Sequence, residues 1–372
     1  MDLSRRDFLK GAAVAAGVLA LPVTTGACVP PKLIELGWHT PEALALKANI
    51  AAYEAQAPCF DGIVVDLLSD AAINNNLQGT QYHMSYLGFS AGNLLSAAAY
   101  SKSIAALKAT PFQRYSHNLM RIVTQPGLMD WFDARQATLT LPNAKLQAQL
   151  ARDCGCKGIF LDTEAYSGQC WNYAKQREVA LHTFEQYQAQ ARLIGQQYGL
   201  ALQAGFPGAD ILLSWGYYLP YSQVSATQTL AQTAYGLLPS FLDGLLDVTN
   251  SPIYDGYEHA YGFKSASDFD KALAELTVGY GSQSSGYGAY YKPSFGLWLD
   301  CYGAWNNTTF AGNWFTPAQW QASLELALAK TSKYVWIYDE GRATSTPTGT
   351  PNWYDGTMPV QYMTATNRAR GV

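Results

Sequence analysis

The chain has 372 residues, and its 24 Lys and Arg against 28 Asp and Glu give a formal net charge of −4. Charged residues make up only 14% of the sequence and form no basic run, which argues against nucleic acid as the main partner. Aromatic residues contribute 13%, with 25 Tyr and 10 Trp. Rings with hydrogen-bonding edges suit stacking against sugars, although a Tyr-rich core explains the same composition.

The N-terminus has the pattern of an export signal. Ser4-Arg5-Arg6-Asp7-Phe8-Leu9-Lys10 matches the twin-arginine motif, and the apolar stretch after it, Gly11 to Val23, is too short for a transmembrane helix. We expect residues 1–27 to be a twin-arginine signal peptide. The exported protein is expected either in the periplasm, free or membrane-anchored as a lipoprotein, or secreted.

The end of the signal has two interpretations. Thr25-Gly26-Ala27-Cys28 is either an imperfect lipoprotein box, in which Cys28 carries a lipid anchor, or a small-residue site cut after Ala27. Lipidation is slightly favoured, although Thr25 replaces the usual Leu.

The other five cysteines are an odd number for an oxidising compartment. No CxxC spacing occurs among them, and no second pair completes a zinc site. At most two disulfides can form, and the sequence does not determine which cysteines pair. No metal or other cofactor is expected.

Beyond the signal, apolar runs alternate with helical patterns, which is typical of βα units around a parallel sheet. Eight strands are expected, the number that closes a βα barrel: Leu33–His39, Gly62–Leu67, Leu119–Thr124, Gly158–Asp162, Ala201–Phe206, Ile253–Glu258, Ser294–Asp300 and Tyr334–Tyr338. We predict an α/β fold, a single-domain (β/α)8 TIM barrel over residues 32–372 with long loops at the carboxyl face. The alternative is a doubly wound open sheet, but no Gly-x-Gly-x-x-Gly follows the first strand.

Three helices are marked by local signals. One begins at Thr40-Pro41 and runs to about Ala55, with Pro at the first helical position. A second, amphipathic, spans about Arg177 to Gln197. The third starts with the capping box Thr316-Pro317-Ala318-Gln319 and continues to about Lys330. Such helices would cover the outside of the barrel.

Acidic side chains follow many of the predicted strands, at the end where a βα barrel places its chemistry. Asp162 and Glu164 are two residues apart at one strand end, so they point the same way. A single acid there is often a helix N-cap or an ion-pair partner. Two on one face repel each other unless a site requires them, which makes this pair the stronger signal.

A ring of carboxylates with aromatic residues between them suits the cleavage of glycosidic bonds. One acid protonates the leaving oxygen while a second carboxylate attacks or activates water. We expect Glu164 to be the general acid, Asp162 to tune its pKa, and Glu258 to be the nucleophile or base, with Asp300 in reserve. Residues expected to bind substrate are Trp38, His39, Asp66, Tyr166, Asp255, Tyr257, Asp300, Trp298 and Glu340.

Three runs, Phe60–Val65, Lys157–Glu164 and Tyr334–Tyr338, resemble bacterial TIM-barrel glycoside hydrolases of poorly characterised families. Asp-x-Glu after strand four is similar to chitinase-like barrels, which implies Glu164 as acid and Asp162 as its helper. The longer acidic pattern that precedes it in those enzymes is missing here. A pairing of strands four and six instead resembles the α-galactosidase-like clan, in which acids on those two strands are nucleophile and proton donor, and this implicates Glu164 or Asp162 with Glu258.

The sequence therefore favours an exported glycoside hydrolase that acts on a polysaccharide or oligosaccharide. Two alternatives stay open: a non-catalytic carbohydrate-binding lipoprotein on a TIM-barrel scaffold, and a polysaccharide lyase or deacetylase. No Gly-x-Ser-x-Gly elbow, phosphate-binding loop or His-Glu-x-x-His motif supports another chemistry. Nothing in the sequence indicates an oligomeric state.

Overall fold

The computed structural model describes residues 30–37, 39–89, 92, 94–124, 130–166, 169–280, 286–301, 305–339 and 351–372. Two predicted site residues, Trp38 and Glu340, lie outside them. Residues 31–372 form one compact unit. Within the described part, no helix has the length and apolarity needed to cross a bilayer.

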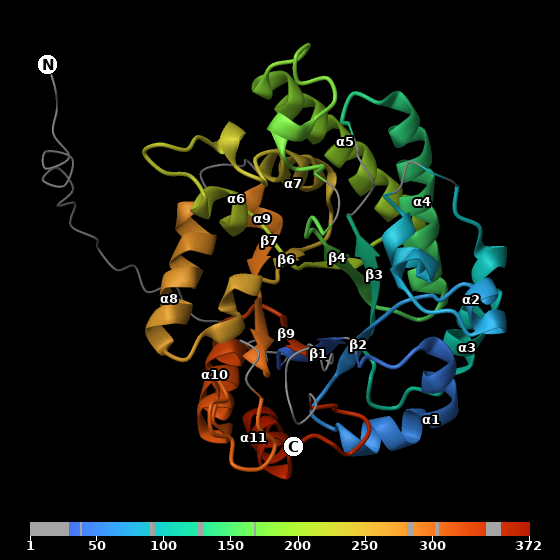
Figure 1. Ribbon diagram of the computed structural model, residues 1–372, viewed down its shortest axis with the longest axis vertical. Coiled ribbons are helices and arrows are strands. Elements are labelled where there is room, and N and C mark those ends of the chain that lie inside the picture. The colour runs from blue at the N-terminus through green and yellow to red at the C-terminus, as the bar shows by residue number, and fades with distance from the viewer. Residues whose placement is uncertain are drawn as a thin grey trace, which may run out of the picture. The chain divides into compact units, whose positions relative to one another are not determined.

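The described strands pair in parallel and form one nine-stranded sheet (Figure 1). They are β1 Lys32–Gly37, β2 Gly62–Val65, β3 Leu119–Val123, β4 Gly158–Asp162, β5 Asp210–Leu213, β6 Ile253–Asp255, β7 Tyr291–Pro293, β8 Phe295–Trp298 and β9 Tyr334–Asp339. Their spatial order is β7-β6-β5-β4-β3-β2-β1-β9-β8, so sequence neighbours are also sheet neighbours along most of the sheet.

The two ends of this order meet, because β7 and β8 are separated by Ser294 alone. The N–H of Ser294 donates to the carbonyl of Asp255 on β6 at 2.9 Å, and the N–H of Ser332, before β9, donates to the carbonyl of Pro293 at 3.0 Å. β7 and β8 thus act as one interrupted eighth strand that bridges β6 and β9. The result is the predicted α/β fold, a (β/α)8 TIM barrel.

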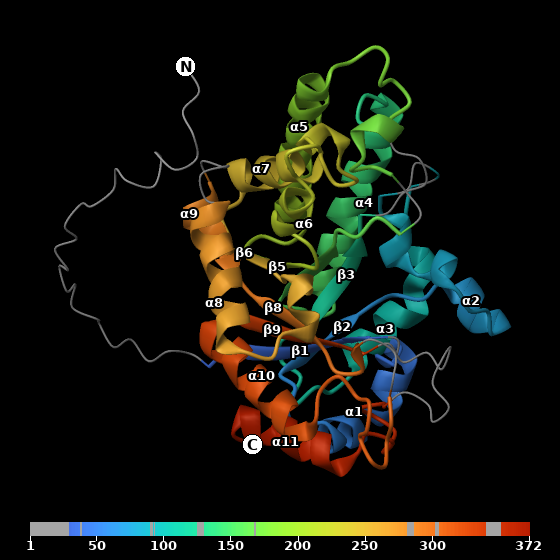
Figure 2. The same ribbon diagram turned by 60° about the vertical axis from the view of Figure 1, so that its left-hand side comes forward.

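Helices surround the barrel on its outer side, as Figures 1 and 2 show. Their bounds are α1 Ala43–Gln56, α2 Asp70–Asn75, α3 Ser101–Ala109, α4 Ala134–Asp153, α5 Phe184–Gly205, α6 Tyr218–Ser222, α7 Leu238–Val248, α8 Ala266–Ala274, α9 Tyr287–Tyr290, α10 Pro317–Lys330 and α11 Val360–Arg370. At least one helix lies between successive barrel strands, which covers the parallel sheet on the face that would otherwise meet water.

The barrel has two separate apolar cores because strand side chains alternate between its two faces. The interior is filled by Ile34, Leu36, Val64, Leu119, Phe160, Leu212, Tyr254, Tyr334 and Trp336. The intervening strand residues pack outward in a larger cluster with the helices. A residue two or four positions from Phe160 or Trp336 on the same strand therefore faces the lumen, and the residues next to it face the helices.

The predicted fifth strand, Ala201–Phe206, is wrong. Residues 201–205 form the last turns of α5, where Leu202 continues the buried stripe of Ile194 and Tyr198. Ala, Leu and Gln are good helix formers, so the apolar run extends the helix. The actual strand, β5, follows a turn at Gly208 with a φ of 75°, and it has only three consecutive apolar residues.

Two long helices begin directly after the residues that cap their N-termini, Thr183 for α5 and Thr316 for α10. The predicted box at α10 is confirmed: Thr316 Oγ1 accepts from the Gln319 N–H at 3.3 Å, and Gln319 Oε1 accepts from the Thr316 N–H at 3.0 Å. α5 begins at Phe184, later than predicted, because Thr183 forms the capping box that sets its first turn. α1 begins at Ala43, two residues after the expected position.

The cysteines of the described residues form no disulfide with one another. Cys59, Cys154, Cys156 and Cys170 are buried. Burial raises the pKa of the Cys59 thiol to about 12 and that of Cys154 to about 11. Thiols of this kind pack as small apolar groups and react slowly.

Candidate functional site

The candidate site lies inside the barrel at the carboxyl ends of β3 and β4. Phe160 belongs to the interior core, so Asp162, two residues further on, also faces the lumen. By the same alternation Arg121 follows Leu119 on β3. The two form an ion pair, with Arg121 Nη2 at 2.6 Å from Asp162 Oδ2.

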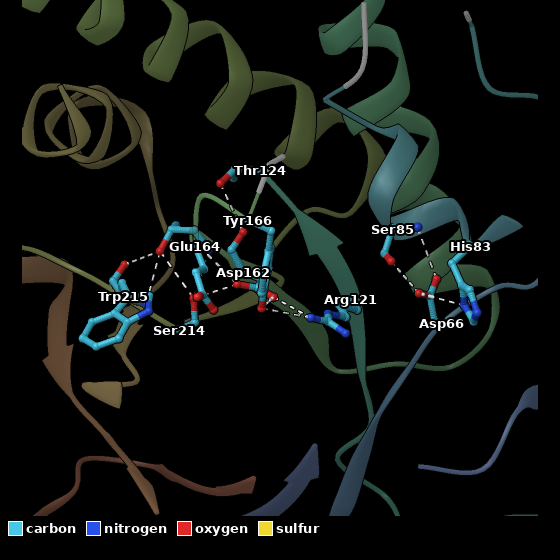
Figure 3. A network of polar contacts seen from close by, with 11 residues as sticks. Asp66, His83, Ser85, Arg121, Thr124, Asp162, Glu164, Tyr166, Ser214 and Trp215 are labelled. Carbon is cyan, nitrogen blue, oxygen red and sulfur yellow. Dashed lines mark hydrogen bonds and ion pairs between the residues drawn. The ribbon is translucent and has the colours of Figure 1, made fainter. Parts of the chain in front are cut away.

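Asp162 is the common acceptor of this network (Figure 3). Its carboxylate also accepts hydrogen bonds from the Tyr166 hydroxyl at 2.9 Å and the Ser214 hydroxyl at 3.1 Å. The backbone N–H of Glu164 donates to it at 3.2 Å. Because Asp162 is only 2% exposed and already accepts from these donors, it orients the segment that carries Glu164.

Glu164 and Glu258, which follow β4 and β6, are both partly buried and share this site. Burial, and then the negative charge of Asp162, raises the pKa of Glu164. Burial, followed by the charges of Glu164 and Asp162, raises the pKa of Glu258 well above its usual range. The N–H of Glu258 also donates to the Ser214 carbonyl at 3.3 Å. The structure therefore brings the three predicted catalytic residues together.

A strained turn presents Glu258. Tyr257 has a φ of 41° and a ψ of 60°, a left-handed conformation that is rare for a bulky residue. Its N–H donates to Asp255 Oδ1 at 2.9 Å, and the Tyr291 hydroxyl donates to Asp255 Oδ2 at 2.5 Å. Gly256 is required beside it, since a Cβ there would lie 2.0 Å from the Leu213 carbonyl oxygen.

Asp255 and Tyr257 were expected to bind substrate, and their positions do not support that role. Asp255 has no exposed surface and Tyr257 is 2% exposed. The Tyr257 hydroxyl donates to Glu275 Oε2 at 3.0 Å, away from the network around Asp162. Burial raises the pKa of Asp255 to about 6. Both residues position the turn that holds Glu258.

Aromatic rings stand next to Glu258. Tyr261 donates a hydrogen bond to the Glu258 carboxylate, and its ring lies 5.5 Å from that of Trp298 and 5.7 Å from that of Tyr338, measured between centroids. These three rings are partly exposed, whereas Trp336 beneath them is buried. Tyr261, Trp298 and Tyr338 form an aromatic wall with hydrogen-bonding edges, which suits a sugar ring.

Two further predicted substrate-binding residues, Asp300 and His39, follow β8 and β1. Asp300 is buried and accepts from Trp298 Nε1 at 2.6 Å, so it supports that ring. His39 Nδ1 lies 3.8 Å from Asp339 Oδ1. Asp339 is fully buried, and it faces the helices because Tyr338 before it faces the lumen.

Asp66, at the end of β2, belongs to a second polar network (Figure 3). Its carboxylate accepts from the Ser85 hydroxyl and the Leu67 N–H, and it lies 3.3 Å from His83 Nδ1. The other ring nitrogen of His83 lies 3.6 Å from Glu42 Oε1. Burial lowers the pKa of His83, but its hydrogen bond and charge interactions with Asp66 outweigh that effect and raise it overall.

Sequence reasoning missed Arg121, Ser214, Tyr86 and His83. Arg121 carried a usable signal: a lone charge inside the apolar strand Leu119–Val123 must face a polar lumen or a partner. Its guanidinium also lies over the ring of Tyr86, 5.1 Å from the centroid. Tyr86 and His83 come from the long segment between β2 and α3, whose path no local pattern indicates.

One family model matches the chain: the TAT (twin-arginine translocation) pathway signal sequence, over residues 2–22. The protein therefore carries the signal for twin-arginine export out of the cytoplasm, as predicted. The comparison with curated proteins gives no match.

Solved structures similar to this chain are TIM-barrel enzymes. GH5_18 from Streptomyces cattleya in complex with GlcNAc is 10% identical, with a TM-score of 0.48 over 92% of this chain and 80% of that one. The catalytic domain of the major endoglucanase from Xanthomonas campestris pv. campestris is 15% identical, with a TM-score of 0.46 over 92% and 95%. Triosephosphate isomerase from Bartonella henselae is 10% identical, with a TM-score of 0.39 over 92% and 100%. Similarity at this level carries no argument about activity.

Proposed function

We propose that this protein is an exported glycoside hydrolase that cleaves a glycosidic bond in a poly- or oligosaccharide with Glu258 and Glu164. The observation that carries the proposal is the pair of partly buried glutamates with raised pKa values beside an aromatic wall. Carboxyl groups that hold a proton at higher pH than usual are what general acid catalysis at a sugar oxygen requires.

The environment of the two glutamates suggests their roles. The pKa of Glu258 is raised well above its usual range, by burial and by the charges of Glu164 and Asp162. Glu258 is therefore the better proton donor to the leaving oxygen. Glu164 is then the carboxylate that attacks the sugar or activates water. This exchanges the two roles that we first expected and keeps the pairing of acids after strands four and six.

The surrounding residues keep this division in place. Arg121, Tyr166 and Ser214 hold Asp162, which adds negative charge to the site and so favours the protonated form of Glu258. Tyr261 opposes that effect, because its hydrogen bond stabilises the Glu258 carboxylate. The aromatic wall would hold the sugar ring against the two carboxyl groups.

The function is tested by incubating purified mature protein with a panel of neutral, acidic and amino polysaccharides and measuring released reducing ends. Glu258→Gln and Glu164→Gln should each lower kcat by at least about 100-fold, the scale of a lost general acid or base. Glu178→Gln, a surface change beside His182, is the matched control. Unsaturated products absorbing in the ultraviolet would indicate a lyase instead, and released acetate a deacetylase.

We also propose that residues 1–27 act as the export signal and that residues 32–372 are the catalytic barrel. Cys28 receives a lipid that anchors the protein to a membrane. Expression in a bacterium with a labelled fatty acid tests this: the wild type should take up label and Cys28→Ser should not. An unlabelled wild type cut after Ala27 would favour a freely diffusing enzyme in the periplasm or outside the cell.

A further inference from the structure

A cavity of about 570 Å³ lies over the ends of β1 and β2, within the size range of about 300–1,000 Å³ that is common for small-ligand sites. Its polar lining includes Glu42, Asp66, His83, Tyr86 and Arg121. The proposed mechanism uses none of the first four. The lining combines carboxylates, an imidazole, a guanidinium and a phenol, so it offers both donors and acceptors.

Two residues of the cavity lining, Arg121 and Tyr86, connect it to the group around Asp162. Arg121 lines the cavity and pairs with Asp162 at 2.6 Å. In Figure 3 it lies between the group around Asp162 and the group around Asp66. Tyr86, on the wall, has its ring 6.4 Å from that of Tyr166, whose hydroxyl donates to Asp162. The cavity and the residues around Asp162 are therefore neighbours, with Arg121 between them.

Arg121 has hydrogen-bonding capacity left over. Its Nη2 reaches Asp162, whereas Nε is buried and has no acceptor among the described residues. A buried N–H without an acceptor costs free energy. Other parts of the Arg121 side chain are open, since 17% of it is exposed, and the residue lines the cavity.

The charges of the lining favour an uncharged ligand. His83 lies between the Asp66 and Glu42 carboxylates, at 3.3 Å and 3.6 Å, and Arg121 is paired with Asp162. Arg121 therefore already has an anionic partner, and a protonated His83 has two. An acidic sugar would meet these carboxylates and a cationic one would meet His83 and Arg121. A hydroxyl group, in contrast, can accept from an N–H and donate to a carboxylate at once.

We infer that the cavity lined by Glu42, Asp66, His83, Tyr86 and Arg121 is a second sugar subsite that binds a neutral, hydroxyl-bearing unit of the same chain whose bond lies at Glu164 and Glu258. This inference rests on the proposed function and names its substrate class, a neutral oligosaccharide. Glu42 is the outer contact, since 46% of its side chain is exposed, and His83 is the inner one.

The test uses the Glu258→Gln protein, in which turnover is blocked under the proposed mechanism, and isothermal titration calorimetry. The probes are cellotetraose, mannotetraose and xylotetraose as neutral chains, tetragalacturonate as an acidic chain and the glucosamine tetramer as a cationic chain. At least one neutral tetramer should bind at least tenfold more tightly than both charged ones. Adding His83→Ala or Glu42→Gln should weaken that binding by at least tenfold, whereas Glu178→Gln should not.

A second measurement separates this subsite from the catalytic site. On protein with Glu258 intact, kcat/KM is compared for the neutral tetramer and for the nitrophenyl glycoside of the same single sugar. His83→Ala should lower kcat/KM for the tetramer at least tenfold more than kcat/KM for the nitrophenyl glycoside. Glu42→Gln, at a partly exposed side chain, should give the same pattern and replaces His83→Ala if that variant unfolds. Tight binding of a charged tetramer, or equal losses on both substrates, overturns the subsite. If wild type hydrolyses nothing, the proposed function fails, and the calorimetry still decides whether the cavity binds sugar.

Discussion

Individual side chains explain why two nearby glutamates can differ in chemistry. Glu164 and Glu258 are both partly buried, but Glu258 lies in the field of two carboxylates, Glu164 and Asp162, which disfavour its charged form. The hydrogen bond from Tyr261 acts in the opposite direction and lowers the pKa of Glu258. The proton on Glu258 is thus controlled by a balance that single substitutions can move.

Tyr261→Phe should therefore shift the alkaline limb of the pH–rate profile to higher pH. The phenol stabilises the Glu258 carboxylate, so its removal raises the pKa of Glu258 further, and the acid form persists to higher pH. The measurement is kcat/KM from pH 4 to pH 10, with Tyr290→Phe on α9 as a surface control. An alkaline limb that stays in place or moves to lower pH argues against Glu258 as the proton donor.

Asp255→Asn should act on the position of Glu258. It weakens the acceptor that holds the left-handed Tyr257 and the Tyr291 hydroxyl, so Glu258 loses its fixed placement. We expect kcat to fall on the order of 100-fold with little change in KM. Tyr291→Phe should show the same split with a smaller loss. A change confined to KM would instead indicate that Asp255 contacts substrate.

At the scale of elements, most strands of the barrel were predictable, whereas several element ends were not. Apolar runs such as Gly158–Asp162 matched the structure because a fully buried parallel strand is apolar on both faces. Ala201–Phe206 failed because the same kind of run also extends a buried helix. For the site, Asp162, Glu164 and Glu258 could be located from strand ends, whereas Asp255 could not be assigned a face without the alternation observed in β6.

Close packing between β8 and β9 depends on Gly296. A Cβ there would lie 2.5 Å from Cε2 of Trp336, whose indole fills the lumen and donates to the Gly256 carbonyl at 3.0 Å. Gly296→Ala should lower the free energy of unfolding by about 1–3 kcal/mol, the usual range for overpacking. Chemical denaturation measures this. Gly288→Ala is the matched control because a Cβ at that helix position meets nothing within 4 Å; equal effects would contradict the packing described.

The whole molecule should lose stability as pH rises from mildly acidic to neutral. Burial raises the pKa of Glu35, on the outer face of β1, from 4.5 to about 7, partly offset by hydrogen bonds from Tyr354 and Thr40. Between these values folded Glu35 keeps a proton that the unfolded chain releases, so folding weakens as pH rises. The shift corresponds to roughly 3 kcal/mol.

Glu35→Gln should flatten this dependence. The amide stays uncharged at every pH, so the variant should lose less free energy of unfolding than wild type between pH 4.5 and 7. Urea denaturation at half-unit pH steps gives both curves. Parallel curves would show that Glu35 ionises in the folded state much as it does in the unfolded chain.

The most direct test of the proposed site is a carboxyl titration followed by ¹³C NMR on protein labelled at the glutamate side-chain carboxyl carbons. In wild type, Glu164 and Glu258 should titrate above the usual glutamate range, and Glu258 should titrate at the higher pH. In Glu164→Gln, which removes one neighbouring negative charge, the pKa of Glu258 should fall. A Glu258 resonance with the same midpoint in both proteins would mean that the two carboxyl groups do not share one site.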